Sequence, residues 1–208
     1  MNYIEINRKA YDNLANQYEE RTHEIDDNFW KKIYDELTIT SSTNVLEIGP
    51  GSGRNLGILR EYTSNLKAIE LSENMSKLIK EKYPTIEIIN KNIMDCILPN
   101  ESQDVILMSA VIHNFPIEDA IKTLKLVGKW LTKDGYLIVS TTVHDTDEEG
   151  LLEKSDYRGN ISRYRHRYTK ESFKNLVETS GYDIYKSVIV KESERVKEWQ
   201  VLICQNRG

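Results

Sequence analysis

The chain of 208 residues has the length of one α/β domain with a sizeable hydrophobic core. Its formal net charge of −5 argues against a protein that binds nucleic acid or membrane surfaces by general electrostatic attraction. No apolar stretch approaches the ~20 residues that cross a bilayer, and the first residues lack the basic region and apolar core of a signal peptide.

The first predicted element is a helix over residues 5–22. Tyr11 and Tyr18 are spaced with two apolar residues so that all four share one helical face. This face either packs on the core or presents its tyrosines to a ligand, and the segment alone supports both. A second predicted helix, over residues 27–37, has an apolar face suited to core packing.

A buried strand followed by a glycine-rich turn organises the rest of the chain. Residues 45–48 form a short apolar run typical of a strand buried on both faces. Three glycines then alternate with other residues before a helical segment: Gly49, Gly51 and Gly53. Glycine permits the turn and lets a ligand approach the backbone closely. The dinucleotide pattern G-x-G-x-x-G needs a glycine where Arg54 stands, whereas Glu47 completes the pattern E-x-G-x-G-x-G.

This pattern resembles motif I of the class I S-adenosylmethionine (SAM)-dependent methyltransferases. A second predicted strand, over residues 65–71, ends in Glu70, about 20 residues after the glycine turn, where an acid can accept hydrogen bonds from both ribose hydroxyls of a nucleoside. The resemblance implies that SAM is the cofactor and S-adenosylhomocysteine the product. It also implies that Glu47, the three glycines, Glu70 and the adjoining Leu71 bind SAM.

The resemblance extends to the N-terminal helix. Residues 11–20 read Tyr-Asp-x-x-Ala-x-x-Tyr-Glu-Glu, which is similar to the lid helix of many small-molecule methyltransferases. In that family the tyrosines face the cofactor and substrate pocket, so Tyr11 and Tyr18 become candidate cofactor-binding residues. The faces of their rings attract cations, and the sulfonium of SAM is one.

The next segments continue the α/β alternation. Ser72 is a predicted N-cap for a helix over residues 73–82, and strands follow over 86–90 and 103–108. Near the start of that helix, Met75 packs either against the adenine or in the core. Residues 92–99 resemble the adenine-contacting stretch of the family and add Asn92 and Ile93 as candidates. The family usually has Asp where Asn92 stands, and Asp95 is an alternative for the aligned residue.

The stretch that follows the fourth strand, residues 109–115, is expected at the carboxyl edge of the sheet. In the family it lines the methyl-transfer centre, often with a histidine in the place of His113, and Ser109 is expected to contact the cofactor. His113 is therefore a candidate catalytic base that also contacts the substrate, or else a structural residue that caps the next helix. The stretch lacks the Asn/Asp-Pro-Pro-Tyr motif of methyltransferases that act on amide or base nitrogens in DNA and protein, and the Pro-Cys nucleophile of those that modify cytosine.

A clear amphipathic helix over residues 116–131, with Pro116 in its first turn, precedes a turn at 133–135 and a strand over 136–140. Residues 142–169 then show little periodicity and are predicted to be an irregular insertion on the substrate side.

The insertion begins acidic and ends basic and aromatic, and an extended backbone would place its three alternating arginines on one face: Arg163, Arg165 and Arg167. Guanidinium groups suit a carboxylate or phosphate, and Tyr164, Arg165 and His166 are candidate substrate-binding residues. The alternative is a solvated charged face that pairs with the acidic half.

The C-terminal third predicts an antiparallel hairpin. Thr169 is placed to cap a helix over residues 170–180, and Gly181 to end it. The two strands that follow, over 182–190 and 199–205, are joined by a connection too short for a parallel crossover. An antiparallel pair is typical of the methyltransferase sheet and disfavours an all-parallel NAD-binding domain.

The sequence thus predicts one α/β domain over residues 1–208. It has a doubly wound, seven-stranded, mostly parallel sheet with an antiparallel C-terminal hairpin, and a helical lid over residues 1–40. The predicted function is methyl transfer from SAM to an oxygen or nitrogen of a small molecule, with a carboxylate-bearing or peptide acceptor included. The expected enzyme is cytoplasmic, because Cys96 and Cys204 resemble buried free thiols, and it has no metal, nucleic-acid or membrane partner. Two alternatives stay open, a SAM-binding accessory protein without catalysis and a methyltransferase of peptides or proteins.

Overall fold

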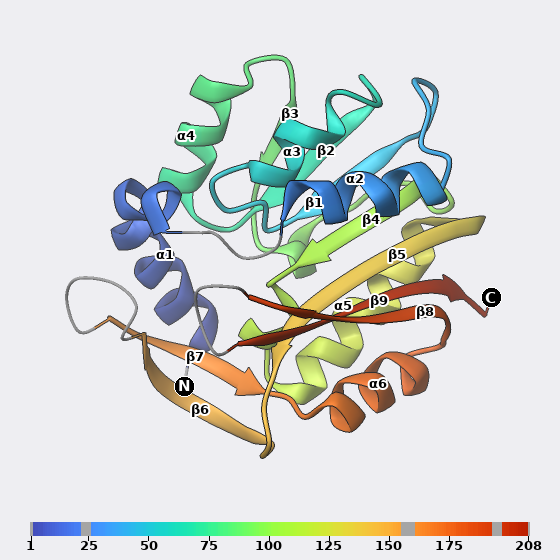
Figure 1. Cartoon of the computed structure of the whole chain (residues 1–208). Coiled ribbons are helices and arrows are strands. Elements are labelled where there is room, and N and C mark those ends of the chain that lie inside the picture. The colour runs from blue at the N-terminus through green and yellow to red at the C-terminus, as the bar shows by residue number, and fades with distance from the viewer. Residues whose placement is uncertain (1, 22–25, 155–160, 193–196, 208) are drawn as a thin grey trace.

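A seven-stranded sheet forms the middle layer of the protein, and a separate two-stranded hairpin lies beside it (Figure 1). The computed structural model describes residues 2–21, 26–154, 161–192 and 197–207, and within these ranges the side chains at 16, 18–21 and 154 are not described. The strands are β1 (Val45–Ile48), β2 (Leu66–Glu70), β3 (Glu87–Asn90), β4 (Gln103–Ser109), β5 (Leu131–Val143), β6 (Glu148–Lys154), β7 (Ile161–Arg167), β8 (Tyr182–Lys191) and β9 (Glu198–Asn206). The helices are α1 (Tyr3–Arg21), α2 (Asp27–Glu36), α3 (Arg54–Leu59), α4 (Glu73–Lys82), α5 (Ile117–Trp130) and α6 (Lys170–Thr179), with short 3₁₀ turns η1 (Ile93–Asp95) and η2 (Ile112–Asn114).

The sheet has the strand order β3-β2-β1-β4-β5-β9-β8. Strands β1 to β5 run parallel, and β9 is antiparallel to both of its neighbours, β5 and β8. The predicted seven-stranded sheet with an antiparallel C-terminal hairpin is confirmed. Because the strand order reverses between β1 and β4, a ligand site is expected at the carboxyl ends of these two strands.

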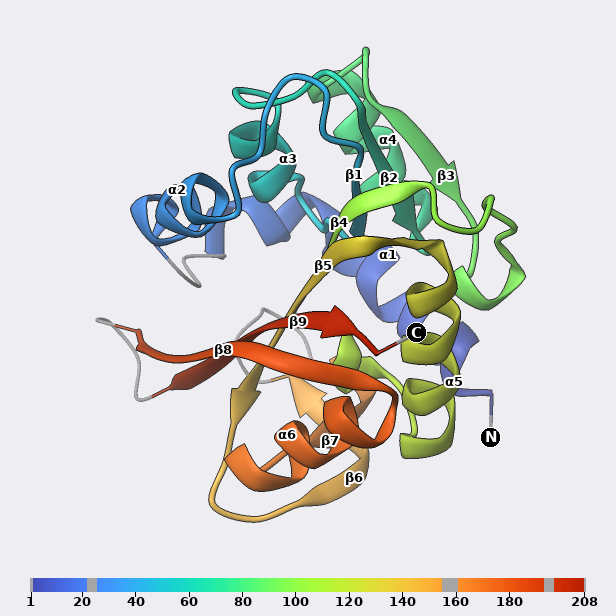
Figure 2. The same ribbon diagram turned by 90° about the vertical axis from the view of Figure 1, so that its right-hand side faces the viewer.

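Alternating side chains of the sheet feed two hydrophobic cores. One core joins the sheet to α2, α3 and α4, and the other joins it to α5 and α6. On β1, Val45 packs into the first core and Leu46 into the second, which explains the unbroken apolar run of this strand. The turned view in Figure 2 shows α2 and α3 on the opposite side of the strands from α5 and α6.

Two predicted boundaries before β6 are wrong. The turn expected at 133–135 lies inside β5, because Leu131 already pairs with Gln103 and the extra residues form a bulge in the register of β4 and β5. Pro116 precedes α5 as its N-cap residue instead of lying in the first turn, because its ψ of 152° is not helical.

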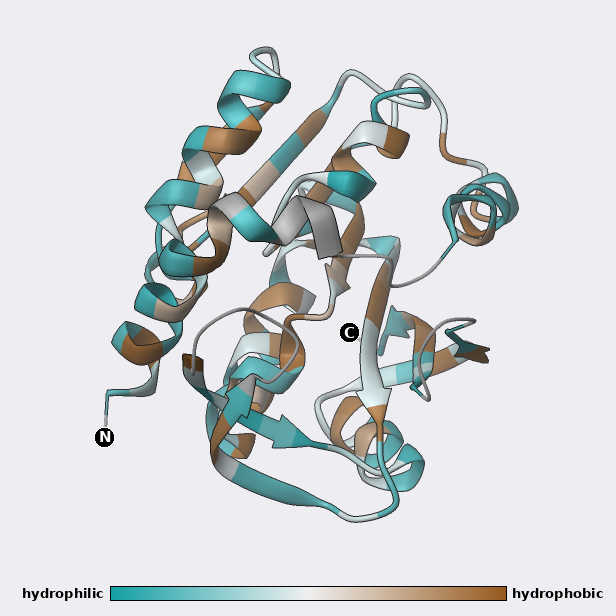
Figure 3. Cartoon of the chain, turned by 60° about the vertical axis from the view of Figure 1, so that its left-hand side comes forward, coloured by the Kyte–Doolittle hydropathy of each residue, from teal (hydrophilic) through white to brown (hydrophobic). Residues whose placement is uncertain are grey.

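The described parts of the insertion at 142–169 are regular where an irregular segment was expected. Strands β6 and β7 pair antiparallel and place the acidic and basic halves opposite each other, with Glu148 facing Arg167 and Glu149 facing His166. Figure 3 shows this hairpin as mostly hydrophilic beside the apolar strands of the main sheet. Cross-strand pairing of opposite charges stabilises these two strands, which the hydropathy pattern of the sequence does not predict.

The predicted end of the chain is confirmed in detail. The Thr169 side chain accepts a hydrogen bond from the backbone N–H of Ser172 at the start of α6, and Gly181, with φ of 102°, follows its end. Both cysteines are buried and neither forms a disulfide. None of the helices in the described ranges is long and apolar enough to cross a membrane.

Candidate functional site

A cavity opens at the carboxyl ends of β1, β2 and β4, where the strand order reverses. Its walls come from α1, the glycine turn, the ends of β2 and β4, and the segments around η1 and η2. Ten of the predicted cofactor-binding residues line it: Tyr11, Glu47, Gly49, Gly51, Glu70, Leu71, Met75, Asn92, Ile93 and Ser109. The sheet thus gathers these residues around one space although they span a hundred positions of sequence.

The glycine turn has a backbone that other residues rarely adopt. Gly49, Gly51 and Gly53 have φ values of 63°, 58° and 77°. A Cβ on Gly49 would also lie 2.5 Å from Cγ2 of Val111. Gly53 is the N-cap residue of α3 and does not line the cavity, so its role is in the backbone conformation of the turn.

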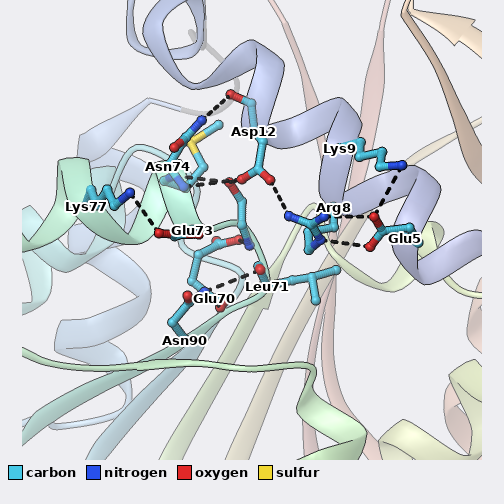
Figure 4. Close-up of polar contacts among 12 residues, drawn as sticks. Glu5, Arg8, Lys9, Asp12, Glu70, Leu71, Glu73, Asn74, Lys77 and Asn90 are labelled. Atoms are coloured by element: carbon cyan, nitrogen blue, oxygen red, sulfur yellow. Dashed lines mark hydrogen bonds and ion pairs between the residues drawn. The ribbon is translucent and has the colours of Figure 1, made fainter.

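Glu70 ends β2 with its carboxylate at the edge of the cavity. Its Oε1 accepts a hydrogen bond from Ser72 N at 2.8 Å, and its Oε2 accepts one from Gly51 N at 3.3 Å. Burial raises the pKa of this carboxyl to about 7, although the backbone donors act in the opposite direction. Asn90 donates to the backbone carbonyl of Glu70 at 2.8 Å and fixes the end of the strand (Figure 4).

Glu47 lies on β1 at the floor of the cavity and is 2% exposed. Burial raises the pKa of its carboxyl to about 8; hydrogen bonds from Asn55 and the Leu56 amide lower it, and the nearby Glu70 raises it. Its Oε2 has no hydrogen-bond partner among the described residues. A buried carboxylate oxygen without a donor suits a ligand that brings one, above all a cation.

Hydrogen bonds hold α1 over the cavity on two sides, at α4 and at β7 with η2. On the α4 side, Asp12 Oδ1 accepts hydrogen bonds from Ser72 Oγ at 2.6 Å and Asn74 N at 3.2 Å, at the N-terminus of α4 (Figure 4). A carboxylate is favoured there by the partial positive charge of the helix end. Asp12 Oδ2 also accepts a hydrogen bond from Arg8 at 2.8 Å, so the same carboxylate contacts both α4 and a second residue of α1.

On the opposite wall, Asn7 joins α1 to β7 and η2. Its Oδ1 accepts from the backbone N–H of Tyr164 at 2.8 Å, and its Nδ2 donates to the carbonyls of Asn114 and Tyr164 at 3.0 and 3.2 Å. The Tyr11 hydroxyl donates to Asn114 Oδ1 at 3.2 Å and accepts from Arg163 Nη1.

The predicted catalytic and substrate residues lie elsewhere. His113 is 2% exposed, does not line the cavity, and has its Nδ1 2.9 Å from Thr141 Oγ1 on β5. The hydrogen bond to Thr141 joins His113 to β5, which is a structural contact other than the predicted capping of the next helix, and the catalytic role stays a prediction. Its neighbour Asn114 faces the cavity instead.

Tyr164, Arg165 and His166 do not line the cavity either. The Tyr164 hydroxyl donates to Glu149 at 2.7 Å, His166 pairs with Asp147 at 2.6 Å, and Arg165 bonds to Thr142. The alternative of charge pairing with the acidic half therefore describes this hairpin. The side chain of Tyr18 lies outside the described residues.

Several cavity residues had no signal in the sequence pattern. Tyr3, Asn7 and Phe115 line the α1 end of the cavity together with Asn114. Asn114 and Phe115 directly follow His113. The sequence therefore predicted where this stretch lies, but not that these two side chains, instead of His113, line the cavity. Within the described ranges, no group of three or more His, Cys, Asp or Glu side chains is arranged to hold a metal ion.

The cavity has acidic residues at its floor and edge and lies where the strand order of the sheet reverses. Comparisons with known proteins show the family of the chain. A family model described as a methyltransferase domain matches residues 19–187, and the chain belongs to this family. An uncharacterized methyltransferase of Staphylococcus carnosus is 25% identical over 189 residues, which are 89% of this chain and 84% of the relative. The ribosomal RNA small subunit methyltransferase A of Malacoplasma penetrans is 31% identical over 106 residues, which are 51% of this chain and 38% of that enzyme.

Solved structures show the same fold. The 1,6-didemethyltoxoflavin-N1-methyltransferase of Burkholderia thailandensis, in complex with 1,6-didemethyltoxoflavin and S-adenosylhomocysteine, aligns with a TM-score of 0.77 at 15% identity. The alignment covers 99% of this chain and 89% of that one. The class I fold, the SAM-dependent methyltransferase class and the SAM cofactor predicted from the sequence are confirmed.

Replacing His113 with asparagine is expected to lower stability and to leave turnover of the folded enzyme nearly unchanged. Loss of the buried contact with Thr141 removes a hydrogen bond worth about 0.5–1.5 kcal/mol, whereas loss of a general base lowers turnover by about 10²–10⁴-fold. Thermal unfolding and turnover per folded molecule, measured on the same samples, separate the two. A collapse of turnover at unchanged melting temperature would support the catalytic role.

Proposed function

We propose that this enzyme transfers the methyl group of SAM to a nucleophilic oxygen or nitrogen of a small molecule held under α1. The observation that carries the proposal is the pair of buried carboxyl groups in one cavity, with Glu70 at the end of β2 and with no donor to Glu47 Oε2 among the described residues. The cofactor is a nucleoside that carries an ammonium group and a sulfonium, so it supplies the hydroxyl donors and positive charges that these groups need.

Within this proposal each residue has a defined contact. Glu70 accepts from both ribose hydroxyls, Glu47 faces the cationic tail, and Gly49 and Gly51 let the backbone approach it. Asn92 and Ile93 bind the adenine. In the structure Asn92 caps η1 by accepting from Met94 N at 3.3 Å, and Ile93 is buried beside it.

The remaining end of the cavity receives the acceptor. Tyr3, Tyr11, Asn114 and Phe115 form its walls, and α1 covers it. SAM supplies a methyl group that is displaced in line from the sulfonium. The protein aligns the acceptor atom and excludes water, and these two effects account for most of the rate enhancement. A small acceptor is supported by the position of α1, whose residues Tyr3, Asn7 and Tyr11 line this end of the cavity.

The proposal is tested by incubating the enzyme with SAM and panels of small amines, phenols and carboxylic acids. Mass spectrometry should detect an acceptor that has gained one methyl group, together with stoichiometric S-adenosylhomocysteine. Methylation of an added protein, with none of any small molecule, would favour the peptide-modifying alternative. SAM binding without any product would favour the accessory protein.

α1 is proposed to act as a lid, and the hydrogen bonds of Asp12 to the start of α4 provide a way to test this. Replacing Asp12 with asparagine removes the charge from two hydrogen bonds to the start of α4, each worth about 1.5–3 kcal/mol when charge-assisted. Amide hydrogen exchange over α1 should therefore accelerate by at least about tenfold in the free variant. In the wild type, SAM should slow exchange over the same amides.

The matched control is Glu5→Gln, because within the described part of the chain the Glu5 carboxylate pairs with Arg8 and Lys9, both on α1 itself. Exchange over α1 in this variant should match the wild type within about threefold. Equal protection of α1 in the free and SAM-bound wild type would show that the helix is a fixed part of the core.

A further inference from the structure

Arg163 on β7 is a buried cation next to the acceptor end of the cavity. This residue is only 6% exposed. Its Nη1 donates to the Tyr11 hydroxyl, and its guanidinium carbon lies 5.7 Å from the centre of the Tyr11 ring. Since Tyr11 lines the cavity, Arg163 stands directly behind that wall.

Two other basic side chains of β7, Arg167 and His166, have carboxylate partners, whereas none is found for Arg163 among the described residues. Arg167 pairs with Glu148 at 2.6 Å, and His166 lies within 3.2 Å of both Asp147 and Glu149. Arg163 forms no ion pair with any carboxylate among the described residues; its bond to the Tyr11 hydroxyl and its contact with that ring are its interactions there. Burying a cation without a counter-charge is costly, so the site is arranged for an anion that arrives with a ligand.

The charged side chains that line the cavity are Glu47, Glu70, Arg54 and Lys91, and Arg54 is paired with Asp27 at 2.8 Å. Arg163 lies outside this lining, behind Tyr11 at the α1 end. The walls beside Tyr11 carry the apolar and aromatic side chains of Ile4, Phe115 and Tyr3. One guanidinium and one hydroxyl match the single negative charge of a carboxylate, and the apolar walls match a hydrocarbon body.

We propose that Tyr11 and Arg163 form a carboxylate subsite, so that the methyl acceptor is an aromatic or aliphatic carboxylic acid. In this subsite the Tyr11 hydroxyl turns from Asn114 Oδ1 to donate to the carboxylate, and Arg163 is a positioning residue that polarises the hydroxyl and supplies the counter-charge. The inference rests on the proposed function, since it concerns the acceptor end of the same cavity.

The experiment uses benzoate as the probe and benzamide as its neutral isostere, titrated into the enzyme saturated with S-adenosylhomocysteine. The wild type should bind benzoate at least about tenfold more tightly than benzamide. Arg163→Gln should lose this preference, and Arg163→Lys should keep part of it because the charge remains. Arg167→Gln is the matched control, since it removes the same charge from the same strand at a side chain paired with Glu148, and it should behave as the wild type.

A second arm decides whether the anion belongs to the cofactor instead. The affinity of S-adenosylhomocysteine, which has its own carboxylate, should change by less than about threefold in Arg163→Gln. A loss of about tenfold or more that is absent for 5′-methylthioadenosine would overturn the proposal, because the arginine would then bind the cofactor. Equal binding of benzoate and benzamide to the wild type would also overturn it.

Failure of the proposed function would look different. S-adenosylhomocysteine would not bind the wild type at all, and the comparison of benzoate with benzamide on the free protein would still decide whether a carboxylate subsite exists.

Discussion

Replacing Glu70 with alanine is expected to weaken SAM binding by at least about tenfold, because two hydrogen bonds from the ribose hydroxyls lose their acceptor. Each bond to a charged acceptor contributes about 1.5–3 kcal/mol, so a loss of both could reach a thousandfold or more. Calorimetric titration with SAM measures the effect. An unchanged affinity would show that Glu70 is not the ribose ligand.

The design must separate this loss from a change in folding. Glu70 also accepts from the backbone amides of Ser72 and Gly51, so the variant leaves two donors without their partner. Thermal unfolding of the free variant measures that cost. Glu73→Ala is the control, because Glu73 lies at the start of α4, is paired with Lys77, and is 62% exposed in its side chain. Its SAM affinity should equal that of the wild type.

Binding of SAM is expected to release on the order of one proton per molecule near pH 7. In the free protein the pKa of Glu47 is raised to about 8 and that of Glu70 to about 7, both mainly by burial. A cation beside Glu47 and hydroxyl donors to Glu70 favour the charged carboxylates, so both groups lose protons as SAM binds. Affinity should therefore increase as the pH rises from 6 to 8.

Calorimetry in buffers of different ionisation enthalpy counts these protons. Glu47→Gln cannot release its proton, so it should show a smaller release together with weaker binding. A proton count that is the same in the variant and the wild type would remove Glu47 from the cofactor site.

The raised pKa of Glu47 also predicts how the stability of the free protein depends on pH. A carboxyl whose pKa is raised in the folded state holds a proton that the unfolded chain releases above its ordinary pKa of 4.5. The stabilising contribution is complete below that value and is lost as the pH rises through 7 to 8. Glu47→Gln should flatten this decline in urea unfolding midpoints.

Local spacing made the cofactor half of the cavity predictable. The glycine turn and Glu70 follow two buried strands that are close in sequence, and parallel strands bring such ends to one edge of a sheet. The antiparallel hairpin of β8 and β9 followed from a connection too short for a crossover.

The acceptor half depends on contacts between distant segments and could not be predicted in this way. Asn7 meets Tyr164 across 157 positions, and Tyr11 meets Arg163 across 152. His113 shows the limit within a correctly placed stretch. Its position at the end of β4 was predictable, but the direction of its ring toward Thr141 depends on the backbone of η2.

The central claim, that this cavity binds SAM as a methyltransferase does, is tested most directly by parallel calorimetric titrations of the wild type with SAM and with NAD. SAM should bind one molecule per chain with a dissociation constant on the order of micromolar, equivalent to about 8 kcal/mol, and NAD should give no binding heat. Tight binding of NAD, with no heat from SAM, would contradict the account.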